Sequence, residues 1–168
     1  MTVYFTYSEG EINIVSRKKE NHESCKSTSI LSTKPTLVAI ELLKAHEEVD
    51  KIYHEKLKKI IESDRVLKKP VVADINTYII LDGHHRVSVL RSLGCRFVPV
   101  VLVDYNSPYI IVESWRNMKI DKETVLSRAL NGKMFPPKTT KHMIQINGKL
   151  KHISFIQKAV NVPLDALK

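Results

Sequence analysis

The stretch YIILDGHHRVSVLRSLG, residues 78–94, changes its pattern halfway along. Four apolar residues lead into an acid, a glycine, two histidines and an arginine. Apolar residues then recur at helical spacing, at Val87, Leu90 and Leu93, and Gly94 follows where a helix commonly ends. The pattern predicts a buried strand that turns sharply into a helix, with the polar residues at the turn.

The turn itself, Asp82-Gly83-His84-His85-Arg86, has the composition of an anion site. The first N–H groups of a helix lack internal partners and lie at the positive end of its dipole. Gly83 permits a sharp turn or a close approach of a ligand, and Arg86 adds a positive fork suited to phosphate. A plainer interpretation is an Asp82 N-cap followed by polar residues. A metal site at the two histidines is disfavoured, because adjacent side chains diverge and no third ligand stands at a typical spacing.

Composition limits the class of protein. With 168 residues, 43% hydrophobic and 27% charged, the chain is expected to form one globular domain or one domain with a small appendage. Its apolar runs are far shorter than the roughly 20 residues of a membrane span, and no signal-peptide pattern opens it. Cys25 and Cys95 lack metal-ligand spacing, so a reduced, cytoplasmic protein is expected. The net charge of +9 fits either a lysine-rich solvated surface or attraction to phosphate or nucleic acid.

The remaining patterns describe short strands and a few helices. They predict a hairpin over 2–16, a polar linker over 17–34, a strand or strand-to-helix lead-in over 36–43, an amphipathic helix over 48–63, and strands over 71–74 and 78–81. Further along they predict strands over 97–105 and 109–115, a helix over 121–132, a proline-stiffened loop over 134–142 and a hairpin over 142–155. This mixture is typical of an α+β fold.

The residues ILDGHHRVSVLRSLG, 80–94, resemble the signature of the ParB/sulfiredoxin superfamily, in which a strand, a Gly-x-x-Arg turn and a helix bind nucleotide phosphates. Sulfiredoxins carry a reactive cysteine immediately before the His-Arg pair, where this chain has His84. ParB partition proteins add a helix-turn-helix domain, which is hard to fit into the fifty or so residues after Trp115. Archaeal free serine kinases carry Asp-Gly-His-His-Arg and a His-Glu pair before the first helix, as here in KAHEEVD, residues 44–50.

The resemblance to the serine kinase branch implies a ParB/sulfiredoxin-like mixed sheet with a few packed helices. It also implies three parts in one compact protein: a hairpin and polar linker over 1–34, a nucleotide-binding core over 35–116, and an extension over 117–168 that completes the substrate site. The expected function is phosphoryl transfer from a nucleotide to the hydroxyl of free L-serine. ATP or ADP is the expected donor, and the short C-terminal lobe favours ATP.

The resemblance also assigns roles to residues of the core. Glu47 matches the general base, which a serine hydroxyl needs because of its high pKa. Glu48 is the alternative base, and both acids are otherwise ordinary first-turn residues of a helix. Asp82 is expected to orient serine or hold Mg²⁺. The expected nucleotide and phosphate ligands are Lys69, Gly83, His84, His85, Arg86 and Val87.

The stretch FPPKTTKH, residues 135–142, resembles a Phe-Pro-x-Lys-Thr-Thr-x-His segment near the end of the serine kinases. The expected substrate-binding residues are His46, Trp115, Thr139, Thr140 and His142, with Lys138 able to reach a carboxylate or phosphate. Plainer interpretations are a connecting loop and a core tryptophan.

Two other functions remain open from the sequence. The first is a non-catalytic ParB-like module that binds nucleotide and regulates DNA or protein partners. The second is a nucleotide hydrolase on the same fold. The serine kinase is preferred because its two matching segments flank the turn, and it requires neither a membrane nor a nucleic acid partner. The sequence leaves monomer and dimer open.

Overall fold

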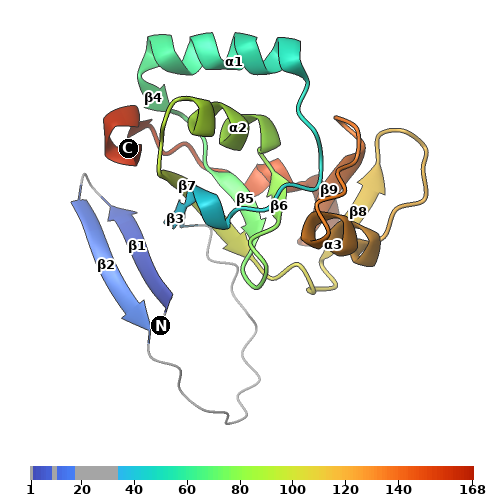
Figure 1. The fold of residues 1–168 in the computed structure, drawn as a ribbon. Helices are drawn as coiled ribbons and strands as arrows, with labels where there is room; N and C mark the ends of the chain where they lie inside the picture. The colour runs from blue at the N-terminus through green and yellow to red at the C-terminus, as the bar shows by residue number, and fades with distance from the viewer. Residues whose placement is uncertain (1, 9–10, 18–33) are drawn as a thin grey trace.

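A computed structural model describes residues 2–8, 11–17 and 34–168 of the chain, with side chains for residues 34–168. The architecture is mixed α+β, as predicted (Figure 1). Part of the predicted linker, residues 18–33, lies outside the described residues. Among the residues that the structure describes, no helix has both the length and the apolar character needed to cross a membrane.

A six-stranded sheet forms the centre of the fold, in the order β2-β1-β3-β7-β5-β6. Its strands are β1 (Thr2–Ser8), β2 (Glu11–Arg17), β3 (Thr36–Ala39), β5 (Val71–Asp74), β6 (Ile80–Asp82) and β7 (Phe97–Val103). β5 and β7 run parallel, and the other neighbours pair antiparallel. The hairpin predicted over 2–16 is confirmed by the β1–β2 pairing.

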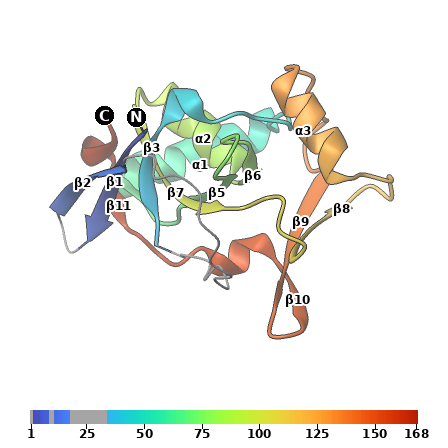
Figure 2. The ribbon, with the colours of Figure 1, turned by 90° about the horizontal axis from the view of Figure 1, so that it is seen from below.

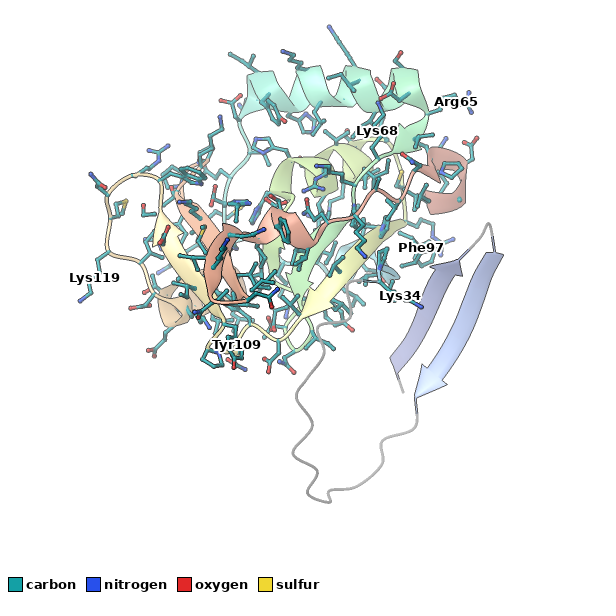
Figure 3. The ribbon with its side chains drawn as sticks, turned by 180° about the vertical axis from the view of Figure 1, so that it is seen from behind. Lys34, Arg65, Lys68, Phe97, Tyr109 and Lys119 are labelled. Carbon is teal, nitrogen blue, oxygen red and sulfur yellow. The ribbon has the colours of Figure 1, made fainter. Side chains whose placement is uncertain are left out.

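Helices α1 (Lys51–Asp64) and α2 (His84–Ser92) cover one face of the sheet, with α2 next to the strands and α1 outside it (Figures 1 and 3). The helix predicted over 48–63 begins later than expected, because Asp50 is its N-cap and accepts a hydrogen bond from the Tyr53 amide at 2.7 Å. The predicted ending at Gly94 is confirmed, since this residue follows the C-cap with φ of 72°.

A second sheet lies at the other end of the molecule (Figure 2). It contains β8 (Ile110–Ser114), β9 (Thr140–Ile146) and β10 (Lys149–His152), and helix α3 (Lys122–Leu130) lies between β8 and β9 in the chain. Two short strands, β4 (Val66–Leu67) and β11 (Val162–Pro163), pair separately. Three 3-10 helices cover Ile40–Leu42, Ile153–Ile156 and Leu164–Leu167.

Two predicted boundaries are corrected by the structure. Thr140 and Lys141 were expected in a loop and His142 where the loop meets the hairpin, but all three open strand β9, because each pairs with a residue of β8. The strand expected over 78–81 is observed at Ile80–Asp82, since Tyr78 adopts a left-handed backbone with φ of 59°.

The central strands divide the interior into two apolar cores. In β5, Val71 and Ala73 pack in the core beneath the helices, whereas Val72 packs in the core toward the second sheet. β7 alternates in the same way, with Val98 on the first side and Val101 on the second. Strands buried on both faces read as continuous apolar runs, which explains FVPVVLV. The turn after β6 therefore starts from a strand that is packed on both sides.

Candidate active site

The turn between β6 and α2 is built around Gly83. This residue is the N-cap of α2 with φ of 107°, a conformation that strains any side chain. A Cβ atom here would lie 3.0 Å from Val71 Cγ2 and 3.1 Å from a guanidinium nitrogen of Arg86. Asp82 is therefore not the N-cap that the plainer interpretation proposed, and its carboxylate is used elsewhere.

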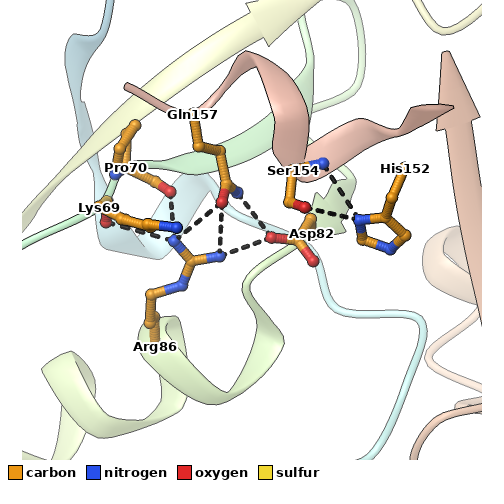
Figure 4. A network of polar contacts seen from close by, with 7 residues as sticks. All are labelled: Lys69, Pro70, Asp82, Arg86, His152, Ser154 and Gln157. Atoms are coloured by element: carbon orange, nitrogen blue, oxygen red, sulfur yellow. Dashed lines mark hydrogen bonds and ion pairs between the residues drawn. The ribbon is translucent and has the colours of Figure 1, made fainter. Parts of the chain in front are cut away.

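Arg86 is partly buried and hydrogen-bonds to several neighbouring groups of the protein. Its Nη1 donates to the carbonyl oxygens of Pro70 at 2.5 Å and Lys69 at 3.3 Å, and its Nη2 donates to Asp82 Oδ2 at 2.5 Å (Figure 4). Gln157 supplies a further acceptor at 3.4 and 3.5 Å. The guanidinium thus ties α2 to Asp82 at the end of β6 and to the two residues before β5. The predicted role of Arg86 toward phosphate stays a prediction.

Glu47 is the centre of the polar contacts between the core and the C-terminal residues. Its side chain is buried, with the residue 8% exposed. Oε1 accepts from the Thr139 amide at 3.1 Å, and Oε2 accepts from the Thr140 amide at 2.9 Å and from the Thr140 hydroxyl. An ionised carboxylate offers about four acceptor positions, so these three bonds fix the group and leave capacity for one more donor.

Main-chain pairing brings these segments together. The Glu48 amide donates to the Phe135 carbonyl at 2.8 Å, and the Phe135 amide donates to the His46 carbonyl at 2.7 Å. Glu48 itself is exposed, whereas Glu47 points inward. Of the two acids considered as a base, only Glu47 lines the cavity described below.

Three neutral histidines lie beside Glu47; His46 and His142 are buried, and His84 is partly buried in the wall of the cavity described below. Burial, followed by repulsion from neighbouring imidazoles, lowers the pKa of His84 to about 3 and that of His142 to about 3. The same causes hold the pKa of His46 well below its usual range. His46 Nε2 lies 3.0 Å from the Thr140 hydroxyl oxygen, and since that hydroxyl donates to Glu47, the imidazole is the donor. His142 Nε2 lies 3.0 Å from the hydroxyl of Tyr105, whose pKa burial raises.

His85 is anchored separately to the start of α1. Its Nε2 accepts a hydrogen bond from the Asp50 amide at 3.0 Å, and its ring meets that of Tyr53 edge-on at 4.8 Å. Because Nε2 accepts, the neutral ring carries its proton on Nδ1. Burial lowers the pKa of His85 and so favours this neutral form. This arrangement fixes the direction of one donor near the turn.

A cavity of about 400 Å³ joins these groups. Its walls hold the predicted residues Glu47, Asp82, Gly83, His84, His85, Arg86, Trp115, Thr140 and His142, together with Lys138. Trp115 is 59% exposed, so its plainer interpretation as a core residue is wrong.

Four predicted residues lie outside the cavity wall. Val87 packs in the core beneath the helices, and Lys69 is exposed, with its carbonyl bound to Arg86. His46 stands behind Thr140, and Thr139 turns its hydroxyl to the Pro136 carbonyl at 2.7 Å. Their predicted roles toward ligands therefore stay predictions.

The cavity wall also contains Tyr53, Leu57 and His152, which the sequence reasoning did not select. Tyr53 and Leu57 lie on α1, which was predicted as an amphipathic helix, but such a pattern does not show which of its residues reach a site. His152 ends β10, and no motif marked it.

Asp82 is the residue expected to hold a metal ion. Within the described ranges, no group of three or more histidine, cysteine or acidic side chains is placed to bind one. Asp82 Oδ2 already accepts from Arg86 at 2.5 Å and from Gln157 at 2.6 Å. Mg²⁺ commonly binds through one or two carboxylates, waters and substrate phosphates. The donor set here fits an ion shared with a nucleotide, not one held by the protein alone.

Sequence comparisons find relatives over part of the chain. No family model matches. A ParB-like protein from Sulfolobus acidocaldarius is 35% identical over 82 residues, which are 48% of this chain and 40% of that protein. An ATP-dependent L-serine kinase from Staphylothermus marinus is 29% identical over 85 residues, covering 48% of this chain and 34% of the relative. The ADP-dependent L-serine kinase SerK from Thermococcus kodakarensis is 33% identical over 102 residues, covering 55% and 41%.

Each of these matches spans less than half the length of the relative. Structural comparison covers more of the chain. A free serine kinase in complex with AMP has a TM-score of 0.67 at 15% identity, covering 80% of this chain and 93% of the other. SbnI with a C-terminal truncation, from Staphylococcus aureus, has a TM-score of 0.57 at 15% identity, covering 79% and 88%. The chain shares the fold of these structures, so the predicted fold is confirmed. The sequence matches to the named serine kinases confirm the predicted resemblance to that branch.

Proposed function

We propose that this chain is a free L-serine kinase that transfers a nucleotide phosphoryl group to the serine hydroxyl and forms O-phospho-L-serine. The observation that carries the proposal is the cavity in which the turn 82–86, Glu47 and Thr140 meet, although these segments are far apart in sequence. The named serine kinases among the relatives and the shared fold support it. Phosphoryl transfer needs chiefly positioned donors and a base, and this cavity combines both.

The proposed nucleotide site is the start of α2. Backbone amides of His84, His85 and Arg86 face the phosphates, because the first amides of a helix have no partner inside it, whereas the Val87 amide already donates to the Gly83 carbonyl at 3.0 Å. The Nδ1–H of His85 is a further donor. Mg²⁺, when bound with the nucleotide beside Asp82, supplies neutralisation of phosphate charge. ATP is the proposed donor, with ADP as the alternative.

Glu47 is the proposed general base. Thr139 and Thr140 hold its carboxylate, and the remaining acceptor position takes the proton of the serine hydroxyl. A positioned base of this kind contributes roughly 10²–10⁴-fold. Trp115, Thr140 and His142 are the proposed wall of the serine site. One extra methyl group is worth only about 1–3 kcal/mol, so threonine should be a poor substrate rather than none.

The test is incubation of the protein with ATP or ADP, Mg²⁺ and each of the twenty amino acids, with phosphorylated product as the readout. Phosphoserine formation with ATP is expected, and threonine should react more slowly. Equal rates on serine and threonine would contradict the proposed pocket. Nucleotide cleavage without any phosphorylated amino acid would indicate a hydrolase. An enzyme that uses free serine and a nucleotide is expected to work in the cytoplasm.

A second candidate is a nucleotide-binding regulator of the ParB type. The ParB-like relative and the net charge of +9 favour it. It predicts a DNA mobility shift that weakens steeply with salt, because neutralised phosphates release counterions. A shift without phosphoserine formation would favour this function over the kinase.

A further inference from the structure

Gln157 is a buried polar residue that no motif in the sequence marks. It directly follows the 3-10 helix Ile153–Ile156 and is 7% exposed. Its Nε2 donates to Asp82 Oδ2 at 2.6 Å, and its Oε1 accepts from Arg86 at 3.4 and 3.5 Å (Figure 4). One amide therefore contacts both charged residues of the turn.

The chemistry of this contact is specific to an amide. Asp82 as a carboxylate only accepts hydrogen bonds, and Arg86 only donates them. The carboxamide satisfies both at once, with its nitrogen toward Asp82 and its oxygen toward Arg86. A carboxylate in the same place would repel Asp82, and an ammonium group would repel Arg86. Buried polar groups left unpaired in this way are costly, so the position is demanding.

The contact also selects between the two oxygens of Asp82. Oδ2 receives both Arg86 and Gln157. No hydrogen bond from any other part of the chain that the structure describes reaches Oδ1. Asp82 lines the cavity, so Oδ1 is its oxygen available to a cationic ligand.

We propose that Gln157 is a positioning residue that fixes Asp82 so that Oδ1 receives the cation accompanying the nucleotide phosphates. This inference rests on the proposed function. It means that a residue after the last hairpin, Gln157, sets the orientation of Asp82 at the proposed nucleotide site. Partners that orient a metal-binding carboxylate typically matter by about 10–100-fold in metal affinity.

The test compares three variants. Gln157→Met keeps length and removes both hydrogen bonds, and Gln157→Glu places a carboxylate beside Asp82. Gln145→Met makes the same change at an exposed glutamine of β9 and is the matched control. Calorimetric titrations measure the affinity for ATP with Mg²⁺ and, with a chelator present, for ATP without it. Thermal unfolding verifies that each variant is folded.

The Gln157→Met variant should bind ATP with Mg²⁺ about 10–100-fold more weakly and bind metal-free ATP as the wild type does. The KM for the magnesium nucleotide should rise more than kcat falls. Gln157→Glu should bind the magnesium nucleotide better at low pH, where the introduced carboxyl is protonated and donates to Asp82. Its affinity should fall as the pH rises, because the introduced carboxyl then becomes ionised and repels Asp82.

Equal loss of affinity with and without Mg²⁺ would reduce Gln157 to a general structural role and overturn the proposal. Unchanged affinity in Gln157→Met, or wild-type protein that gains nothing from Mg²⁺, would overturn it as well. These titrations contain no serine. The variants could therefore show the expected differences in affinity while the wild type makes no phosphoserine. That result would refute the proposed kinase function and still support the role of Gln157.

Discussion

Replacement of Glu47 by glutamine tests whether this residue acts in catalysis or only stabilises the fold. Both oxygens of Glu47 are acceptors, for the amides of Thr139 and Thr140 and for the Thr140 hydroxyl. In either orientation of the new amide, its NH₂ group faces a main-chain N–H. One buried donor then loses its partner, which costs about 1–3 kcal/mol of stability. Under the proposed function, loss of this base should lower kcat by roughly 10²–10⁴-fold.

The assay measures phosphoserine formation at saturating ATP and serine, with urea unfolding and nucleotide titration in parallel. Nucleotide affinity should stay near that of the wild type, because the proposed phosphate donors lie at the start of α2. Glu48→Gln is the matched control, since this neighbouring acid is exposed and should keep full activity. Near-normal turnover in Glu47→Gln would remove Glu47 from the mechanism. A decrease no larger than the unfolded fraction would reduce it to a structural residue.

Three further changes test the architecture. His84 and His142 have a pKa of about 3 when folded, because burial disfavours the charged form, against about 6.5 when unfolded. The unfolded chain then binds more protons, so the free energy of unfolding should fall by about 1.4 kcal/mol per pH unit for each histidine as the pH drops from about 6.5 toward 3. Arg86→Lys should cost about 1.5–3 kcal/mol in urea unfolding, because an ammonium cannot serve all the acceptors of the fork. Gly83→Ala should cost about 1–3 kcal/mol through backbone strain and contact with Arg86.

Controls for these changes come from the same chain. His142→Gln should flatten the pH dependence of stability, and an unchanged slope would exclude that histidine as its source. Arg65→Lys alters an exposed pair with Asp165 and should cost no more than about 1 kcal/mol. If Arg86→Lys lowers the free energy of unfolding no more than Arg65→Lys does, the hydrogen bonds of Arg86 to the Pro70 and Lys69 carbonyls contribute little to stability.

The turn after β6 was predictable because its chemistry and its local structure occupy the same few residues. The apolar run, Gly83 and the helical spacing that follows indicated a strand, a tight turn and a helix N-terminus. Glu47 and Thr140 were each predicted as site residues, yet nothing local indicated that Thr140 binds Glu47. That contact depends on main-chain pairing of residues 46–48 with Phe135, which is a matter of tertiary packing.

Gln157 and His152 escaped prediction for a related reason. Both adjoin a 3-10 helix after the last hairpin, where side chains follow neither the period of a strand nor that of an α-helix. In the sequence, a buried glutamine also cannot be told from one at the surface. What distinguishes Gln157 is its contact with two oppositely charged side chains, and no local pattern shows that contact. Pattern reasoning finds apolar faces and motifs, but it does not locate single polar partners brought together from distant segments.

The partners of Glu47 determine when its carboxylate can be fixed during synthesis of the chain. A chain leaves the ribosome from its N-terminus, and segments fold as they become available. The proposed base is made early, but all three of its donors come from residues 139 and 140. Until they emerge, Glu47 lacks the groups that fix its carboxylate. Under the proposed function, a chain that stops near residue 116 should therefore be inert toward serine.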